Sequence, residues 1–203
     1  MNLREKSQEV RVLFDELDQE IKAFLDQSQL GCIAGCGRCC ANPKVSASIL
    51  EFLPLAFDLY EKGKAESALE LLENSSENDF CIVYKSLSAD GESGFCSDYV
   101  NRGLICRLFG SSARVNRLGE REVITCKKIK TEKADLYQHA ALEIKKDMPV
   151  PSSSGTYRRL NNIDSRLAED QMPINQAIRA ALEKVMDYMY YFENQEPEAA
   201  ENF

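Results

Sequence analysis

Four cysteines lie within nine residues, in the run GCIAGCGRCC from Gly31 to Cys40. The packing of an ordinary core does not require thiols at this density, whereas thiolates at such spacing can converge on one metal ion or cluster. The run also contains Gly31, Gly35 and Gly37, and glycine lets a backbone curl closely around a bound ion. We therefore expect a fold organised around a sulfur-rich centre whose first ligands are Cys32, Cys36, Cys39 and Cys40.

Four further cysteines are spread along the next part of the chain and can complete this centre. An even cysteine count would indicate disulfides in a small secreted protein. This chain has 203 residues and needs no such cross-links, and adjacent cysteines joined to each other would be strained. Metal binding is therefore favoured for all eight cysteines, with disulfides as the second interpretation. The second group consists of Cys81, Cys96, Cys106 and Cys126.

Composition narrows the class of protein. A net charge of -8 at pH 7 disfavours broad attraction to nucleic acid or to an anionic membrane. No apolar run approaches the roughly 18–20 residues that span a bilayer, and the N-terminus lacks the apolar stretch of a signal peptide. We expect a cytoplasmic protein without nucleic-acid or membrane partners, in a compartment where thiols stay reduced.

Apolar periodicity predicts helices on both sides of the cysteines. The spacing of apolar residues from Val10 to Leu25 indicates an amphipathic helix over about 3–28, and a second strong stripe runs from Ile174 to Met189. Ser48 and Glu51 have the spacing of a capping box at a helix start, and Pro54 predicts an early kink or restart. Further helices are expected at about 64–74, 131–146 (with Thr131 as N-cap) and 173–192.

The middle of the chain, from Phe80 to Cys126, has little regular periodicity. Short extended segments are expected at 81–84, 95–99, 104–109 and 122–125, and Pro149 to Gly155 reads as a loop. The predicted fold class is mainly α, with helices flanking a small irregular cysteine-rich metal-binding subregion that has short extended segments. We expect one metal-binding domain over 1–192, a cysteine-cluster region at 31–128, and an acidic disordered tail at 193–203.

The adjacent pair Cys39 and Cys40 makes a single tetrahedral site awkward. Side chains of neighbouring residues usually diverge. We therefore hypothesise that the two thiols face different sites, or different metals of one polynuclear centre, so that eight thiols divide into two groups of four. One four-cysteine site with the remaining cysteines buried in the core stays an alternative.

Basic residues adjoin several cysteines in the sequence. Thiolates gain from nearby cations because a divalent metal with four thiolates carries a charge of about -2. The candidate cations are Arg38, Arg107, Lys127 and Lys128.

Two cysteine motifs resemble the YkgJ-type cysteine-cluster family, a zinc- or iron-chelating domain with a CxxCxxCC signature. The first motif is Cys32-x3-Cys36-x2-Cys39-Cys40, with one extra residue in the first gap. The second runs from Cys96 to Phe109, where Gly103 replaces the proline of the family pattern and Cys106 keeps its register. The resemblance covers somewhat under half of the chain and implies metal or Fe–S binding, with an undefined biochemical role.

The type of ligand does not distinguish between zinc, iron and an Fe–S cluster, since soft thiolates suit all of them. Asp135, His139 and Glu143 share one face of a predicted helix, but we interpret this face as a solvated polar stripe.

The leading prediction is a cytoplasmic zinc- or iron-binding protein whose metal also holds the middle region together. An Fe–S-dependent redox or group-transfer enzyme, or an accessory subunit, is the alternative. Two further classes are weaker. The Cys36–Cys39 pair lacks the βαβ context of a thioredoxin-like enzyme, and the acidic balance disfavours a zinc-finger-like nucleic-acid module.

Overall fold

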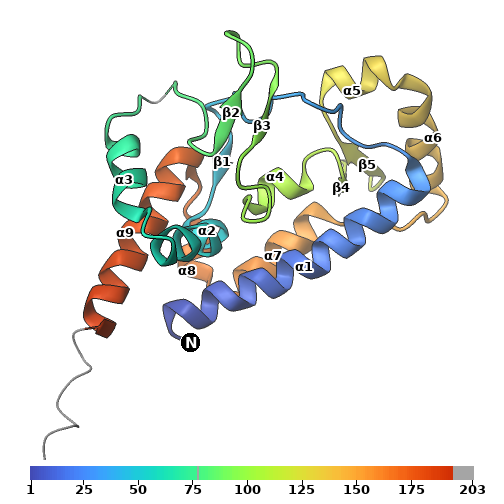
Figure 1. Ribbon diagram of the computed structural model, residues 1–203. Coiled ribbons are helices and arrows are strands. Elements are labelled where there is room, and N and C mark those ends of the chain that lie inside the picture. The colour runs from blue at the N-terminus through green and yellow to red at the C-terminus, as the bar shows by residue number, and fades with distance from the viewer. Residues whose placement is uncertain (77, 194–203) are drawn as a thin grey trace, which may run out of the picture.

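The computed structural model describes residues 1–76 and 78–193 of the chain. It is mainly helical, with 55% helix, and over these residues it contains nine helices and three two-stranded sheets. This confirms the predicted fold class. Figure 1 shows helices at both ends of the molecule, with a β-hairpin and a short helix between them.

Helix α1 (Leu3–Ser28) runs along much of the molecule and joins its two hydrophobic clusters (Figure 1). The Asn2 side chain accepts a hydrogen bond from the Glu5 backbone N–H and Glu5 accepts from Asn2, which forms a capping box at the helix start. Its apolar stripe from Val10 to Ile21 lies in the larger cluster, whereas Phe24 lies in the smaller one. The predicted amphipathic helix is therefore confirmed with its bounds.

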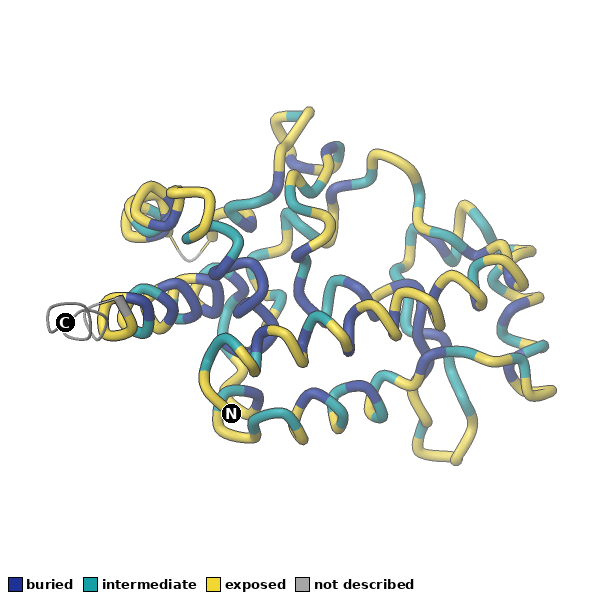
Figure 2. Tube along the Cα trace, turned by 60° about the horizontal axis from the view of Figure 1, so that its bottom comes forward, coloured by how far each residue is buried: buried dark blue, intermediate teal, exposed yellow. Residues whose placement is uncertain are grey.

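The larger cluster is built by α1, α2 (Ile49–Glu61), α3 (Ala65–Glu73) and α9 (Ile174–Glu193). The last helix packs mainly against α2 and α3, and Figure 2 shows the buried side of each helix turned inward. The predicted apolar stripe of α9 is buried in full: Ile174, Ala177, Ile178, Ala181, Leu182, Val185 and Met189.

Helix α2 begins as the sequence predicts but continues through its proline. The Glu51 carboxylate accepts a hydrogen bond from the Ser48 backbone N–H at 3.0 Å, as in a capping box. Pro54 lies inside the helix without ending it, so the expected restart is wrong. The Pro54 carbonyl accepts a hydrogen bond from the Arg11 guanidinium at 2.8 Å, which ties the helix to α1.

The smaller cluster lies at the other end of α1. It is formed with β5 (Arg121–Ile124), α5 (Lys127–Glu132) and α6 (Ala134–Lys145). Helix α6 is capped at Lys133, and Thr131 lies within α5, where its hydroxyl donates to the Lys127 carbonyl at 2.9 Å. The prediction of a helix starting at Thr131 is therefore wrong. The buried residues of this cluster are Phe24, Leu30, Val123, Ile129, Ala140 and Ile144.

Three small antiparallel sheets connect the helices. β1 (Ser46–Ala47) pairs with β6 (Met172–Pro173), β2 (Tyr84–Ser86) with β3 (Gly94–Cys96), and β4 (Ser112–Val115) with β5. Within the β2–β3 hairpin, Tyr84 lies opposite Cys96. The irregular middle of the chain therefore has two short hairpins as its only sheet structure among the described residues.

Several local predictions fail where long-range contacts decide the structure. The segment expected to be extended at 104–109 is helix α4 (Leu104–Leu108). Within the expected loop at 149–155, α7 (Ser153–Ile163) already begins at Ser153, because the Ser152 hydroxyl caps it by accepting from the Gly155 N–H at 3.2 Å. α8 (Ser165–Glu169) follows it.

Beyond Glu193, the acidic tail predicted to be disordered lies outside the described residues. Among the described helices, none combines the length and apolar character needed to cross a membrane.

Candidate metal centre

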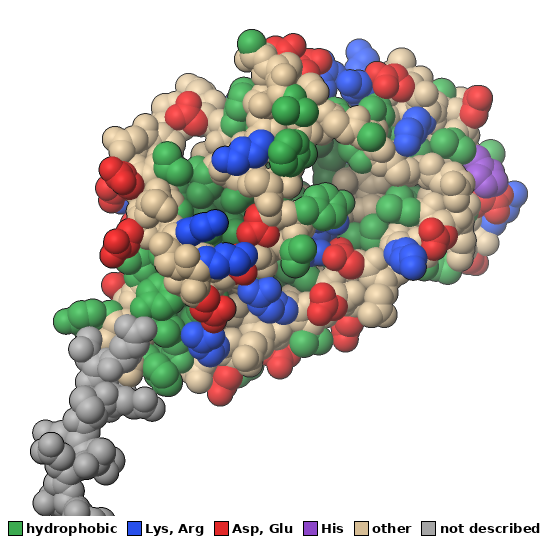
Figure 3. Space-filling model, in the orientation of Figure 1, with side chains coloured by type: hydrophobic (Ala, Val, Ile, Leu, Met, Phe, Trp, Pro, Cys, Tyr) green, Lys and Arg blue, Asp and Glu red, His purple; other side chains and the backbone are tan. Residues whose placement is uncertain are grey.

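All eight cysteines line one cavity of about 610 Å³. The cavity is bounded by α1, α4, α5, the β2–β3 hairpin and the loop that precedes β1. Figure 3 shows the surface hollowed between the hairpin and β5. The structure therefore brings together every predicted site residue, and all eight are free thiols: Cys32, Cys36, Cys39, Cys40, Cys81, Cys96, Cys106 and Cys126.

The first four cysteines lie on a loop that is tied to the turn of the β2–β3 hairpin. Cys36 forms an isolated bridge with Ser93, and the Gly37 N–H donates to the Glu92 carbonyl at 2.9 Å. A Cβ added at Gly37 would lie 1.6 Å from the Tyr84 hydroxyl oxygen, so only glycine fits there without a shift. Gly37 therefore allows a close approach of the cysteine-rich loop to the hairpin.

Cys40, Cys81 and Cys96 meet at the base of this hairpin. The Cys81 N–H donates to the Cys40 carbonyl at 3.3 Å, and the Tyr84 N–H donates to the Cys81 carbonyl at 2.8 Å. Because Tyr84 is opposite Cys96 in the hairpin, backbone hydrogen bonds link all three cysteines.

Cys106 reaches the cavity from α4. A buried carboxylate oxygen of Glu51 accepts a hydrogen bond from the Ile105 N–H at 3.0 Å, which holds the first turn of this helix. At Gly103, the N-cap of α4, an added Cβ would lie 2.8 Å from the Phe52 ring. Close packing against α2 therefore accounts for glycine at the position where the family pattern has proline.

Cys126 and Cys32 approach the cavity from the opposite end. Cys126 is the N-cap of α5, and its sulfur accepts a hydrogen bond from the Ile129 N–H at 3.4 Å. The Lys133 ammonium donates to the Gly31 carbonyl at 2.6 Å and to the Cys32 carbonyl at 3.4 Å. Lys133 therefore fastens the start of the cysteine-rich loop to the end of α5.

Partial loss of solvation raises the pKa of several of the thiols, even at Cys39, where the residue as a whole is exposed. Loss of solvation raises the pKa of Cys39 to about 12, of Cys40 to about 11 and of Cys81 to about 12. Neighbouring thiols add to the effect: after burial, Cys126 is the main influence on the pKa of Cys39, whereas Cys96 is the main one for Cys40. The adjacent cysteines therefore have different closest electrostatic partners.

Three of the four basic residues adjacent to cysteines in the sequence have carboxylate partners in the structure. Arg107 pairs with Asp18, and Lys128 lies 4.0 Å from Glu132. Arg38 donates to Glu92 at 2.8 Å, although its charge also interacts with Cys36 and Cys126. Sequence neighbours of these cysteines thus have carboxylate partners of their own.

Arg102 is the cation that the sequence reasoning missed near Cys40 and Cys96. Its positive charge favours the thiolate form of both residues and partly offsets the effect of burial on their pKa. The guanidinium lies 3.7 Å from the centre of the Tyr99 ring, and its buried Nε has no hydrogen-bond partner. Lys133 has the corresponding effect on the pKa of Cys32.

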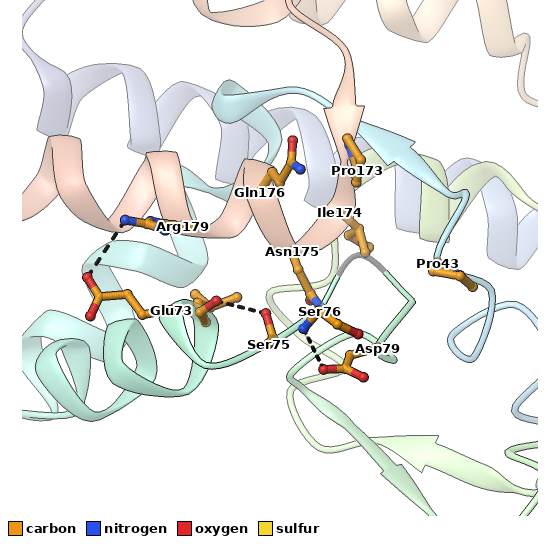
Figure 4. A pocket seen from close by; sticks show the side chains of 11 residues that line it. Pro43, Glu73, Ser75, Ser76, Asp79, Pro173, Ile174, Asn175, Gln176 and Arg179 are labelled. Atoms are coloured by element: carbon orange, nitrogen blue, oxygen red, sulfur yellow. Dashed lines mark hydrogen bonds and ion pairs between the residues drawn. The ribbon is translucent and has the colours of Figure 1, made fainter.

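A second pocket of about 160 Å³ lies at the start of α9 (Figure 4). There the Asn175 side chain donates to the Phe80 carbonyl at 2.9 Å and accepts from the Ile82 N–H at 3.0 Å. Arg179 lies 3.7 Å from Glu73 in the same pocket. The two Asn175 hydrogen bonds hold the segment that carries Cys81 against the last helix, whereas the Arg179–Glu73 pair joins α9 to α3.

The donor atoms of this cavity suit a metal ion, although they are not arranged in a coordination geometry. Among the residues that the structure describes, no three Cys, His, Asp or Glu side chains are arranged to hold a metal ion. Eight soft sulfur donors around one cavity nevertheless form the donor set that zinc and Fe–S clusters prefer. His139 is exposed on α6 and does not line the cavity.

Comparison with known families agrees with this chemistry. Residues 31–129 match the CxxCxxCC family, described as "Putative zinc- or iron-chelating domain". The resemblance drawn from the two cysteine motifs is thereby confirmed for this segment, and the family description assigns it no defined biochemical role. No curated protein and no solved structure matches the chain.

Proposed function

We propose that the eight cavity cysteines bind zinc or iron as thiolates and that the bound metal stabilises the middle of the chain. The observation that carries this proposal is the gathering of all eight thiols around one cavity, from segments more than 90 residues apart in sequence. A bound metal would supply strong bonds between these segments.

The structural part of the proposal follows from how little else holds this region. Between Phe80 and Cys126 the regular structure consists of two short hairpins and α4. The exposed side chains here include Phe95, Tyr99 and Val100, so apolar burial contributes less than it does in the helical clusters. Metal–sulfur bonds would compensate for this small core.

An Fe–S-dependent redox or group-transfer activity is the second candidate, and the size of the cavity favours it. Ligand pockets usually measure about 300–1,000 Å³, and a volume of 610 Å³ lies within that range. Apolar side chains such as Ile21, Phe52 and Ile105 form part of the wall beside the thiols. A small organic substrate would therefore have room next to a metal centre.

Anaerobic purification followed by metal analysis and an absorption spectrum tests the proposal. We expect stoichiometric zinc or iron in the purified chain. Broad absorption near roughly 400 nm with acid-labile sulfide would identify an Fe–S cluster, and a colourless zinc protein would exclude the second candidate. Protein that contains no metal, and takes up none when zinc or iron is added, would refute the proposed function.

A further inference from the structure

We propose that the eight thiols form two separate four-thiolate sites, and that the metal of one site exchanges readily while the other is retained. The inner site consists of Cys40, Cys81, Cys96 and Cys106; the outer site consists of Cys32, Cys36, Cys39 and Cys126. This inference rests on the proposed function and assigns the ligands of that centre. Each site would bind a cation that prefers thiolate ligands, such as Zn²⁺.

The inner site is defined by the hairpin base and the larger hydrophobic cluster. Cys81 is bonded through its N–H to the Cys40 carbonyl, and Cys96 lies opposite Tyr84 in the hairpin. Cys81 is a buried member of the larger cluster, and Cys40 and Cys106 pack against it. Three of the four thiols therefore share one wall of packed side chains.

The outer site is defined by the smaller cluster and by α5. Cys126 packs against that cluster and caps α5, and Lys133 at the end of α5 binds the carbonyls of Gly31 and Cys32. These contacts place the two ends of the outer set, Cys32 and Cys126, on the same structural unit. Cys36 and Cys39 lie on the loop between this unit and the hairpin.

The adjacent pair marks the boundary between the sites. Cys39 is exposed, whereas Cys40 is half-buried against the larger cluster. A single tetrahedral ion shared by both residues would require both side chains to turn to the same side.

Exposure predicts which metal exchanges. Two outer ligands, Cys32 and Cys39, are exposed, while the inner Cys81 is only 8% exposed. A chelator can reach the outer ion from solvent, whereas the inner ion would lie against the packed side chains of the larger cluster, which contains Cys81.

Zinc release from the intact chain tests this inference. Metal-free protein is loaded with Zn²⁺ alone, the bound zinc is counted, and its transfer to a chromophoric chelator is followed in time. We expect two ions in the wild-type chain, one released rapidly and one slowly. Cys39→Ser should lose the rapid ion and keep the slow one, and Cys40→Ser should do the reverse.

Matched variants keep the result interpretable. His139→Ala, which changes an exposed residue outside the cavity, should keep both ions and both phases. If Cys40→Ser does not fold, a second pair of variants replaces the first. Cys96→Ser then changes a half-buried ligand of the inner site, and Cys32→Ser changes an exposed ligand of the outer site. If neither inner variant folds, the number of zinc-release phases of the wild-type chain decides between one site and two.

Three results would overturn the two-site inference alone. The wild-type chain could bind only one ion, it could release both ions in a single phase, or Cys39→Ser and Cys40→Ser could lose the same ion. A chain that binds no zinc and no iron would instead overturn the proposed function on which it rests.

Discussion

The Glu51 carboxylate accepts a hydrogen bond from the backbone N–H of Ile105, the residue before Cys106, at 3.0 Å. Glu51 is completely buried, and its other oxygen accepts from the N–H and hydroxyl of Ser48 at 3.0 and 3.1 Å. Burial raises its pKa above the ordinary carboxyl value, in spite of these hydrogen bonds. One side chain thus caps α2 and positions the helix that carries a proposed metal ligand.

Glu51→Gln should lower the free energy of unfolding by about 1–3 kcal/mol, because the amide group places a donor where a buried acceptor is needed. The measurement is urea unfolding of the metal-free chain at neutral pH. Glu61→Gln changes an exposed residue at the end of the same helix and should alter stability by less than about 0.5 kcal/mol. Equal effects of the two variants would contradict the role assigned to Glu51.

Arg102→Gln should weaken metal binding by about 10–100-fold, as expected when a group that supports metal ligands is removed. The reason is that the Arg102 charge favours the thiolate forms of Cys40 and Cys96. Competition titrations with a chelator measure the change. Arg114→Gln changes an exposed residue of β4 that pairs with Glu122 at 3.3 Å and lines neither pocket, so it serves as control and should bind metal normally. Unchanged affinity in Arg102→Gln would show that its charge does not act on the centre.

Metal binding should release protons, because burial holds the pKa of Cys39, Cys40 and Cys81 well above neutral and the metal-free thiols are protonated. Affinity should therefore fall on acidification, by about tenfold per pH unit for each proton displaced. Calorimetric titration in two buffers of different ionisation enthalpy counts these protons. An affinity independent of pH between 6 and 8, with no proton release, would mean that protonated thiols are not displaced.

Metal removal should loosen the middle of the chain before its helical ends. Chelator-treated protein should be cleaved by a protease within residues 80–126, while α1, α2 and α9 stay protected by the larger cluster. Limited proteolysis followed by mass spectrometry locates the cuts. Identical cleavage with and without metal would contradict the stabilising role of the metal, although not binding itself.

The long helices could be predicted because their apolar periodicity is sufficient by itself. The stripes of α1 and α9 are buried with the residues that the sequence indicates. The Ser48–Glu51 spacing was likewise a local signal, and it appears as a capping box. In contrast, the helical conformation of 104–108 depends on a hydrogen bond from Ile105 to Glu51, 54 residues away, which no local pattern contains.

The candidate site was predictable in its residue types and less so in its surroundings. The density of cysteines in 32–40 pointed to a thiolate centre, and all eight thiols line one cavity. The supporting cations were missed because the reasoning searched among immediate neighbours, whereas Arg102 and Lys133 lie four and seven residues from Cys106 and Cys126. Arg102 precedes α4 and acts on Cys40 and Cys96, which come from other segments, so no local spacing indicates its role.

X-ray absorption at the zinc or iron edge tests the central claim most directly, because it reports the atoms bound to the metal. For protein purified without oxygen, we predict a first shell of sulfur alone, at about 2.3 Å for zinc. The fitted number should be four sulfur ligands per zinc ion in the wild-type chain. A variant with one cavity cysteine replaced by serine should bind less zinc, and the zinc that it retains should keep its sulfur shell. A first shell made mainly of nitrogen or oxygen, unchanged in the cysteine variants, would contradict thiolate binding in this cavity.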